Sequence, residues 1–178
     1  MRNELLKNQK KDSLCEIYTN YDNPGKFAVG FITSVGDEHF LFEPIDEFGK
    51  IWGPTCQRID VVFKIKTGSK YLAKIQQLLN FNNQKRSSLV FDSENLLFDF
   101  LGYLCKKKEV CEISLCEGQL CDEIGFIVEF SESVVNVKSL NDFGDVDGVS
   151  TISLDEINYI EYASDVTKRA TILFNSNQ

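Results

Sequence analysis

The sequence has few of the residues from which catalytic and metal sites are usually built. Its 178 residues include one histidine, one tryptophan, one methionine and three prolines. A Ser-His-Asp or Cys-His arrangement must therefore use His39, which stands beside Asp37 and Glu38 at the start of an expected strand. No phosphate-binding loop, dinucleotide glycine fingerprint or Cys-x-x-Cys pair is present. We expect a protein that is not an enzyme and that holds no cofactor and no metal.

Positive charge is also scarce. The chain has 19 Lys and Arg against 27 Asp and Glu, a formal charge of -8 and a pI of about 4.7. Binding to a phosphate backbone relies on the opposite balance, so nucleic acid is a disfavoured partner unless basic residues converge locally. Three clusters are candidates for such convergence: Lys7, Lys10 and Lys11; Lys85 and Arg86; and Lys106, Lys107 and Lys108.

Long apolar segments are missing as well. Residues 1–12 do not resemble a signal-peptide core, and no later segment approaches the ~18 apolar residues that a membrane-spanning helix needs. We expect a cytoplasmic protein without membrane contact, in which thiols stay reduced. Cys116 and Cys121 flank a four-residue loop, so a disulfide between them under oxidation is the alternative to the free thiols that we favour.

The sequence contains an internal repeat. Gly30-Phe31-Ile32 recurs as Gly125-Phe126-Ile127, which is 95 residues later, and Phe48-Gly49 recurs as Phe143-Gly144 at the same offset. Cys15-Glu16-Ile17 matches Cys111-Glu112-Ile113 at an offset of 96, so one residue of length differs in a loop. We interpret this pattern as an internal duplication of one small unit.

Apolar residues alternate within each copy, which is typical of half-buried strands. We expect five short strands in each copy, near residues 14–20, 26–35, 39–45, 52–59 and 61–67, and then near 110–116, 122–131, 134–140, 147–154 and 156–162. Five closely joined strands favour a small antiparallel barrel, because closure removes exposed strand edges.

Helical periodicity appears outside the strands. We expect helices near 2–11, 71–79 and 93–107, with Ser69 and Ser93 as N-caps of the last two. The polar stretch between them is the preferred boundary. The predicted organisation is a first barrel at 1–80 with a helix on either side, a linker at 81–92, and a second barrel at 93–178 preceded by a helix. The fold class is mainly β with flanking α-helices.

A helix followed by five short strands resembles the Sm-like barrel, which is related to SH3-like barrels. The first Sm-like signature resembles two sets of residues here: Gly30, Ile32, Val35 and Gly36-Asp37, and Gly125, Ile127, Phe130 and Ser131-Glu132. The second signature resembles Arg58, Val62 and Ile65 in the first copy, and Ile157 and Ile160 in the second. The resemblance implies two tandem five-stranded barrels and a tendency to form homo-oligomers.

The residues that bind RNA in Sm-like proteins are not retained. Their base-contacting Asn corresponds to Phe40 and Val135, and the Gly of their Arg-Gly pair corresponds to Ile59 and Leu154. Arg58 is present without its glycine, and its counterpart is Ser153. The resemblance therefore carries over the architecture and not the RNA site.

The loops at 45–53 and 140–148 are the most suggestive repeated feature. As a partner-binding site they would offer acidic residues and aromatic anchors, namely Asp46, Glu47, Phe48, Trp52, Asp142, Phe143 and Asp145. A simpler interpretation, which we favour for the loops themselves, is that Gly49 and Gly144 supply positive φ while each Phe packs back on its own barrel. Asp142, Asp145 and Asp147 do not fit the register of a calcium loop.

These observations predict a binding or adaptor protein that contacts a protein partner, or itself, through the repeated loops. The alternative is binding of a small anion, a nucleotide or RNA between the barrels, with Arg58, Lys106, Lys107 and Lys108 as ligands. An enzyme of unknown class is the third hypothesis.

Overall fold

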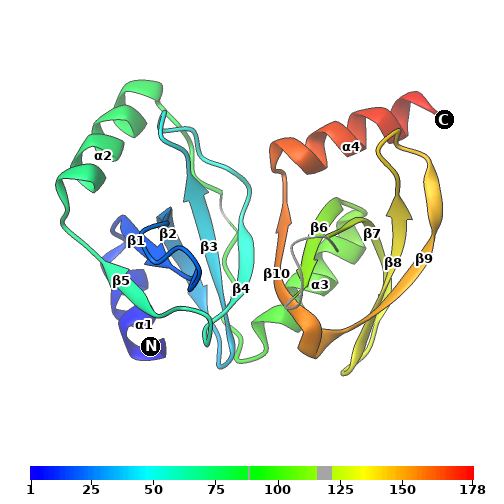
Figure 1. Ribbon diagram of the computed structural model, residues 1–178, viewed down its shortest axis with the longest axis horizontal. Coiled ribbons are helices and arrows are strands. Elements are labelled where there is room, and N and C mark those ends of the chain that lie inside the picture. Colours follow the sequence, from blue (N-terminus) through cyan, green and yellow to red (C-terminus); the bar gives the residue numbers. More distant parts are fainter. Residues whose placement is uncertain (88, 116–121) are drawn as a thin grey trace. The chain divides into compact units, whose positions relative to one another are not determined.

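The computed structural model describes residues 1–87, 89–115 and 122–178, and the chain divides into two compact units, Met1–Leu96 and Leu97–Gln178 (Figure 1). The first unit contains α1 (Arg2–Lys11), β1 (Cys15–Tyr18), β2 (Ala28–Val35), β3 (His39–Ile45), β4 (Thr55–Arg58), β5 (Lys64–Lys66) and α2 (Lys70–Asn82). The second contains α3 (Leu96–Lys107), which begins at the boundary, then β6 (Val110–Leu115), β7 (Glu123–Phe130), β8 (Val134–Leu140), β9 (Val146–Ser153), a 3-10 turn (Leu154–Glu156), β10 (Ile157–Tyr162) and α4 (Asp165–Ser176).

The mainly β class with flanking helices is confirmed. Ser69 caps α2, because its hydroxyl accepts the Leu72 N–H at 3.1 Å. Ser93 is not the N-cap of α3, because that helix begins three residues further on, at Leu96. Helix α4 was not predicted, and Ser164 caps it by accepting the Thr167 N–H at 3.2 Å.

Both units have the same antiparallel strand order: β5-β1-β2-β3-β4 in the first and β10-β6-β7-β8-β9 in the second. The prediction of closed five-stranded barrels is wrong. In the described residues no ladder joins β4 to β5 or β9 to β10, so each unit has an open sheet. The backbone beyond β4 bonds elsewhere instead, since Ile59 N–H donates to the Glu38 carbonyl at 2.8 Å and Phe63 N–H to that of Tyr18 at 3.1 Å.

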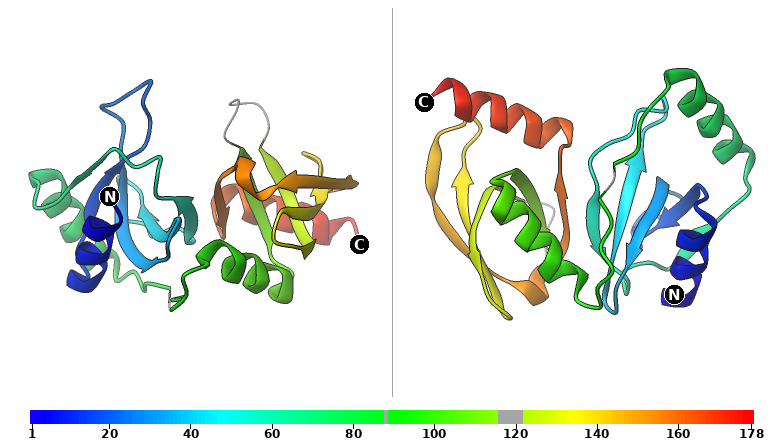
Figure 2. Two further views of the ribbon diagram at one scale, coloured as in Figure 1. Left: turned by 90° about the horizontal axis from the view of Figure 1, so that it is seen from below. Right: turned by 180° about the vertical axis from the view of Figure 1, so that it is seen from behind.

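The first unit buries apolar side chains in two clusters. Leu5 of α1 belongs to one cluster, with strand residues that include Phe40 and Phe42. Leu72, Ile75 and Leu79 of α2 belong to the other, with strand residues that include Val29 and Phe31. Both helices therefore stabilise the sheet by removing apolar surface from water. Figure 2 shows the long β1–β2 connection projecting from this sheet.

The second unit also buries apolar residues of its helices. Leu97, Phe100, Leu101 and Leu104 of α3 are buried. Ala170 of α4 packs with Val110 and Leu140, and Phe174 packs against them.

Equivalent residues of the two units make equivalent contacts. The β2–β3 ladder shifts register between Ile32 and Ser34, and the β7–β8 ladder shifts between Ile127 and Glu129, positions that are 95 residues apart. A Cβ on Gly30 would lie 2.2 Å from the Glu43 carbonyl oxygen, and one on Gly125 would lie 2.2 Å from that of Lys138. In each unit the neighbouring strand therefore lies too close to this position for a residue with a Cβ, which explains why the glycine of Gly-Phe-Ile recurs.

No helix in the described part of the chain has the length and apolar character required to cross a membrane.

Candidate functional site

The turn between β3 and β4 is held rigidly by its own side chains. Asp46 Oδ1 accepts the backbone N–H of Phe48 and of Lys50, each at 2.9 Å. Asn82, at the end of α2, donates from Nδ2 to the Phe48 carbonyl at 2.8 Å. Gly49 lies between them at φ +80, where a Cβ would come 2.7 Å from the Leu78 Cβ. The turn is therefore fixed both by the Asp46 cap and by its contact with α2.

The turn between β8 and β9 repeats this arrangement. Asn141 Oδ1 accepts the backbone N–H of Phe143 at 2.9 Å and of Asp145 at 3.0 Å. Asn177 donates to the Phe143 carbonyl at 3.0 Å and to Asp145 Oδ1 at 3.0 Å. Gly144 also has φ +80 and lies against α4. An amide thus replaces the Asp46 carboxylate without changing the turn.

These turns present phenylalanines to solvent. Phe48 is 70% exposed and Phe143 is 75% exposed. The expectation that each Phe packs back on its own unit is wrong, although the positive φ expected for both glycines is confirmed. The cause is the Asx-type cap, which binds the backbone N–H of the phenylalanine two positions later, while α2 or α4 lies against the inner side of the turn.

The other predicted loop residues have different surroundings. Trp52 is half-buried, with its Nε1 3.4 Å from Asp46 Oδ2 and the Lys50 ammonium 5.3 Å from its ring centroid. Glu47 and Asp142 are exposed beside the phenylalanines. Asp46 and Asp145 both take part in their turns. The structure thus brings Asp46, Glu47, Phe48 and Trp52 together in one turn, and Asp142, Phe143 and Asp145 together in the other.

The predicted basic ligands are dispersed. Arg58 lies in the first unit and pairs with Asp60, whose carboxylate accepts the Arg58 Nε at 2.9 Å. Lys106, Lys107 and Lys108 lie at the end of α3 in the second unit, where all three are exposed. Cations at the end of a helix also complement its dipole.

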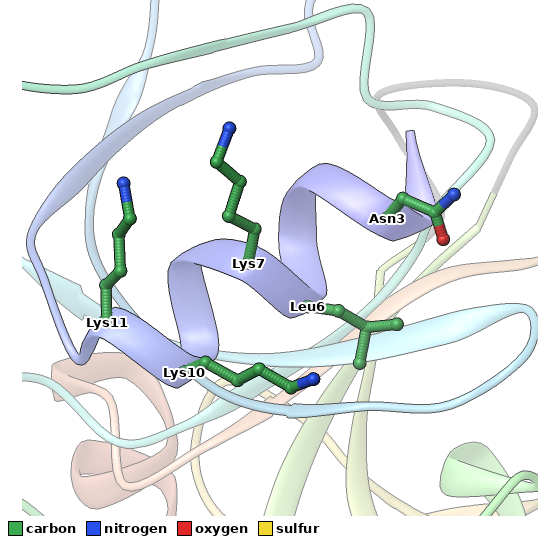
Figure 3. A pocket seen from close by; sticks show the side chains of 5 residues that line it. All are labelled: Asn3, Leu6, Lys7, Lys10 and Lys11. Atoms are coloured by element: carbon green, nitrogen blue, oxygen red, sulfur yellow. The ribbon is translucent and has the colours of Figure 1, made fainter.

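A hollow of about 510 Å³ follows α1, lined by Asn3, Leu6, Lys7, Lys10 and Lys11 (Figure 3). Lys7 is 3.5 Å from the Glu4 carboxylate. Figure 3 shows Lys7 and Lys11 projecting on one side of the helix and Lys10 on another, so these three ammonium groups do not converge on one anion.

A cluster that sequence reasoning missed surrounds Arg86 beside β2 and β3 in the first unit, and we call it the Arg86 cluster. The Arg86 guanidinium lies 3.9 Å from the centroid of the Phe31 ring. Its Nε donates to Glu43 Oε2 at 3.1 Å, and its NH1 pairs with Asp12 at 2.5 Å. The Ser87 N–H donates to the other Glu43 oxygen at 2.6 Å, and the Phe91 N–H donates to the Ser34 hydroxyl at 2.8 Å. Arg86, Ser87 and Phe91, which follow α2, are thereby held beside the sheet.

The second unit has a cavity of about 640 Å³ lined by residues of α3, β7, β8 and α4. Phe126 and Phe174 form one part of its wall, with their ring centroids 5.0 Å apart. Lys108 and Lys138 contribute ammonium groups to the lining, and the Lys138 Nζ lies 5.8 Å from the Phe174 ring centroid. Cys105, which is partly exposed, also lines this cavity.

The thiols of Cys15, Cys56 and Cys111 are buried. Burial, followed by the nearby Glu16 carboxylate, raises the pKa of Cys15 to about 12, and burial raises the pKa of Cys111 to about 12. Burial also raises the pKa of Cys56. These cysteines are therefore weak nucleophiles at neutral pH. Cys116 and Cys121 lie outside the described residues.

His39 is half-buried, and burial together with the Arg58 charge lowers its pKa to about 4. Its imidazole is therefore neutral at pH 7. Across residues 1–87, 89–115 and 122–178, no group of three His, Cys, Asp or Glu side chains is placed to hold a metal ion.

No protein-family model, no curated protein and no solved structure matches this chain.

Proposed function

We propose that the chain is an internal duplication of a small unit related to Sm-like and SH3-like folds, with an open sheet in each copy. A helix followed by antiparallel strands in the order β5-β1-β2-β3-β4 supports this relationship. The duplication is supported by the contacts that recur at an offset of 95, from the register shifts to the capped turns.

We propose that the protein is a non-enzymatic binding or adaptor protein, which contacts a partner protein or a second copy of itself through the two phenylalanine-tipped turns. The observation that carries this proposal is the exposure of Phe48 and Phe143 on turns that are already ordered. An exposed aromatic ring on a fixed backbone loses little conformational entropy when it is buried in a partner's pocket. Exposed large apolar groups held in this way are typical of interaction surfaces.

The test replaces the two rings. The double variant Phe48→Ser and Phe143→Ser keeps the backbone hydrogen bonds of both turns, so we expect it to fold normally and to lose its partner. Native mass spectrometry of the wild type, purified from the cells that make it, identifies the partner or the number of copies in the assembly. The same measurement on the double variant should then show the bare monomer.

Tyr21→Ser is the matched control, because Tyr21 is 68% exposed and lies in another loop of the first unit. Circular dichroism checks that all variants are folded. Retention of the same partner by the folded double variant would refute the proposal, as would an equal loss caused by Tyr21→Ser.

A further inference from the structure

The Arg86 cluster of the first unit and the cavity of the second are built from equivalent residues. Phe31 corresponds to Phe126, and Glu43 corresponds to Lys138, each at an offset of 95. Asp12 corresponds to Lys108 at an offset of 96, and both have left-handed backbones directly after their helices, with φ 47 and φ 54. Gln9 and Cys105 each donate to the carbonyl of an equivalent residue, Thr33 or Val128. The two sites therefore share one backbone frame.

The charges on this frame are reversed. In the first unit two carboxylates, from Asp12 and Glu43, bind a guanidinium that lies on the Phe31 ring. In the second unit two ammonium groups, from Lys108 and Lys138, line the cavity together with Phe126. Glu43 acts only as an acceptor towards Arg86 and Ser87, whereas a lysine acts only as a donor. The cavity of the second unit is thus suited to a segment that presents hydrogen-bond acceptors to Lys108 and Lys138.

We propose that the cavity of the second unit binds an extended acidic segment of a partner protein, with an Asp or Glu carboxylate between Lys108 and Lys138. The backbone of this segment lies beside the sheet as Ser87 and Phe91 do in the first unit. None of the residues that line the cavity belongs to a phenylalanine-tipped turn, and the proposal holds whether or not those turns bind a partner.

The charge of the unit favours a single carboxylate over a polyanion. Residues 1–96 carry 13 Lys and Arg against 12 Asp and Glu, a net charge of +1, whereas residues 97–178 carry 6 against 15, a net charge of -9. A nucleic acid would extend beyond the two lysines into this negative field. A short segment with one carboxylate needs only the ammonium groups of Lys108 and Lys138, and its apolar atoms can contact Phe126 and Phe174.

The test uses two peptides with the sequence of residues 84–92, one unchanged and one with Arg86→Glu. The full-length protein is labelled with ¹⁵N and titrated with each. The Glu peptide should shift the amide signals of Lys108, Phe126 and Lys138, and it should bind about tenfold more tightly than the Arg peptide. In the double variant Lys108→Asp and Lys138→Glu, which copies the two carboxylates of the Arg86 cluster, this preference should reverse.

The double variant Lys106→Glu and Lys107→Glu is the matched control. It makes the same change in net charge at the end of α3, but neither residue lines the cavity, so the preference for the Glu peptide should persist. A measurement that needs no variant is alkylation of Cys105, followed by mass spectrometry of that site. The Glu peptide should slow alkylation and the Arg peptide should not.

Three outcomes would overturn the proposal. They are equal binding of the two peptides, loss of the preference in the Lys106 and Lys107 control, and shifts of the cavity signals by oligouridylate without any by the Glu peptide.

Discussion

Glu16, which is buried, and Glu112, which is partly buried, lie at equivalent positions. Their pKa values shift in opposite directions because the residues opposite them differ. Glu16 faces Lys66 across the β1–β5 ladder, and it also accepts hydrogen bonds from Ser69 and Tyr18. Burial alone would raise the pKa of Glu16, but these hydrogen bonds and the Lys66 charge outweigh that effect and lower it. Glu112 instead faces Glu161 across the β6–β10 ladder. Burial, followed by the charges of Glu161 and Asp122, raises the pKa of Glu112 to about 7.

The Glu112→Gln substitution should stabilise the protein above pH 7. A carboxyl group with a folded pKa of about 7 and an ordinary value of 4.5 binds more protons when folded. Its contribution to stability is therefore present below pH 4.5 and is lost as the pH rises through 7. Because Glu112 is only partly buried and solvent still screens its charge, we expect a gain on the order of 1 kcal/mol in the free energy of unfolding at pH 8. Urea denaturation at pH 4.5, 6 and 8 measures this.

Glu161→Lys is the partner experiment, since it recreates the pair that Glu16 makes with Lys66. It should remove the same pH dependence by lowering the pKa of Glu112. If the free energy of unfolding of Glu112→Gln falls with pH between 4.5 and 7 as steeply as that of the wild type, Glu112 is not the titrating group.

The capped turns belong to the element scale, because each one joins two strands and contacts a helix. Gly49→Ala should destabilise the protein by about 2 to 4 kcal/mol, since φ +80 is strained for alanine and the new Cβ would meet Leu78. Gly68→Ala is the matched control, because Gly68 has φ +68 but open space around it, and we expect a cost of about 1 kcal/mol. Guanidinium denaturation followed by the fluorescence of Trp52 reports on the first unit. Equal costs would mean that contact with α2 does not hold the turn.

Most elements could be predicted because their periodicity is local. The strands and α1 lie within a few residues of their expected ranges, since alternation and capping are properties of neighbouring residues. The sequence also contains a signal for helix α4, because Ser164 follows Ser69 by 95 residues and both serines cap a helix.

The open sheet and the exposed rings were not predictable in this way. Barrel closure depends on where the N–H groups of Ile59 and Phe63 find acceptors, and those acceptors are distant in sequence. The turn that presents Phe48 is bonded to Asn82, which is 34 positions away. The candidate loop residues were identifiable because they recur, whereas the Arg86 cluster joins Asp12, Glu43 and a residue after α2 and leaves no local pattern.

At the scale of the whole molecule, charge is divided unequally between the units, with a net charge of +1 in residues 1–96 and -9 in residues 97–178. The lysines of α1 do not converge, and Arg58 pairs with Asp60. We therefore expect no saturable binding of single-stranded RNA at about 150 mM salt. Fluorescence anisotropy with labelled oligouridylate measures this, and a dissociation constant in the micromolar range would restore the anion-binding hypothesis.

Because Arg86 is tethered, an incoming ligand needs a higher concentration to bind at the Arg86 cluster than at the cavity of the second unit. Arg86 is linked to the carboxylates that bind it by a few residues after α2, and short tethers of this kind correspond to effective concentrations in the millimolar range. A free cationic peptide must outcompete that local concentration before it is bound. A ligand of the cavity in the second unit binds at its bulk concentration. A dilute acidic segment can therefore bind the second unit, whereas a cationic segment at the same concentration does not displace Arg86 from the first unit.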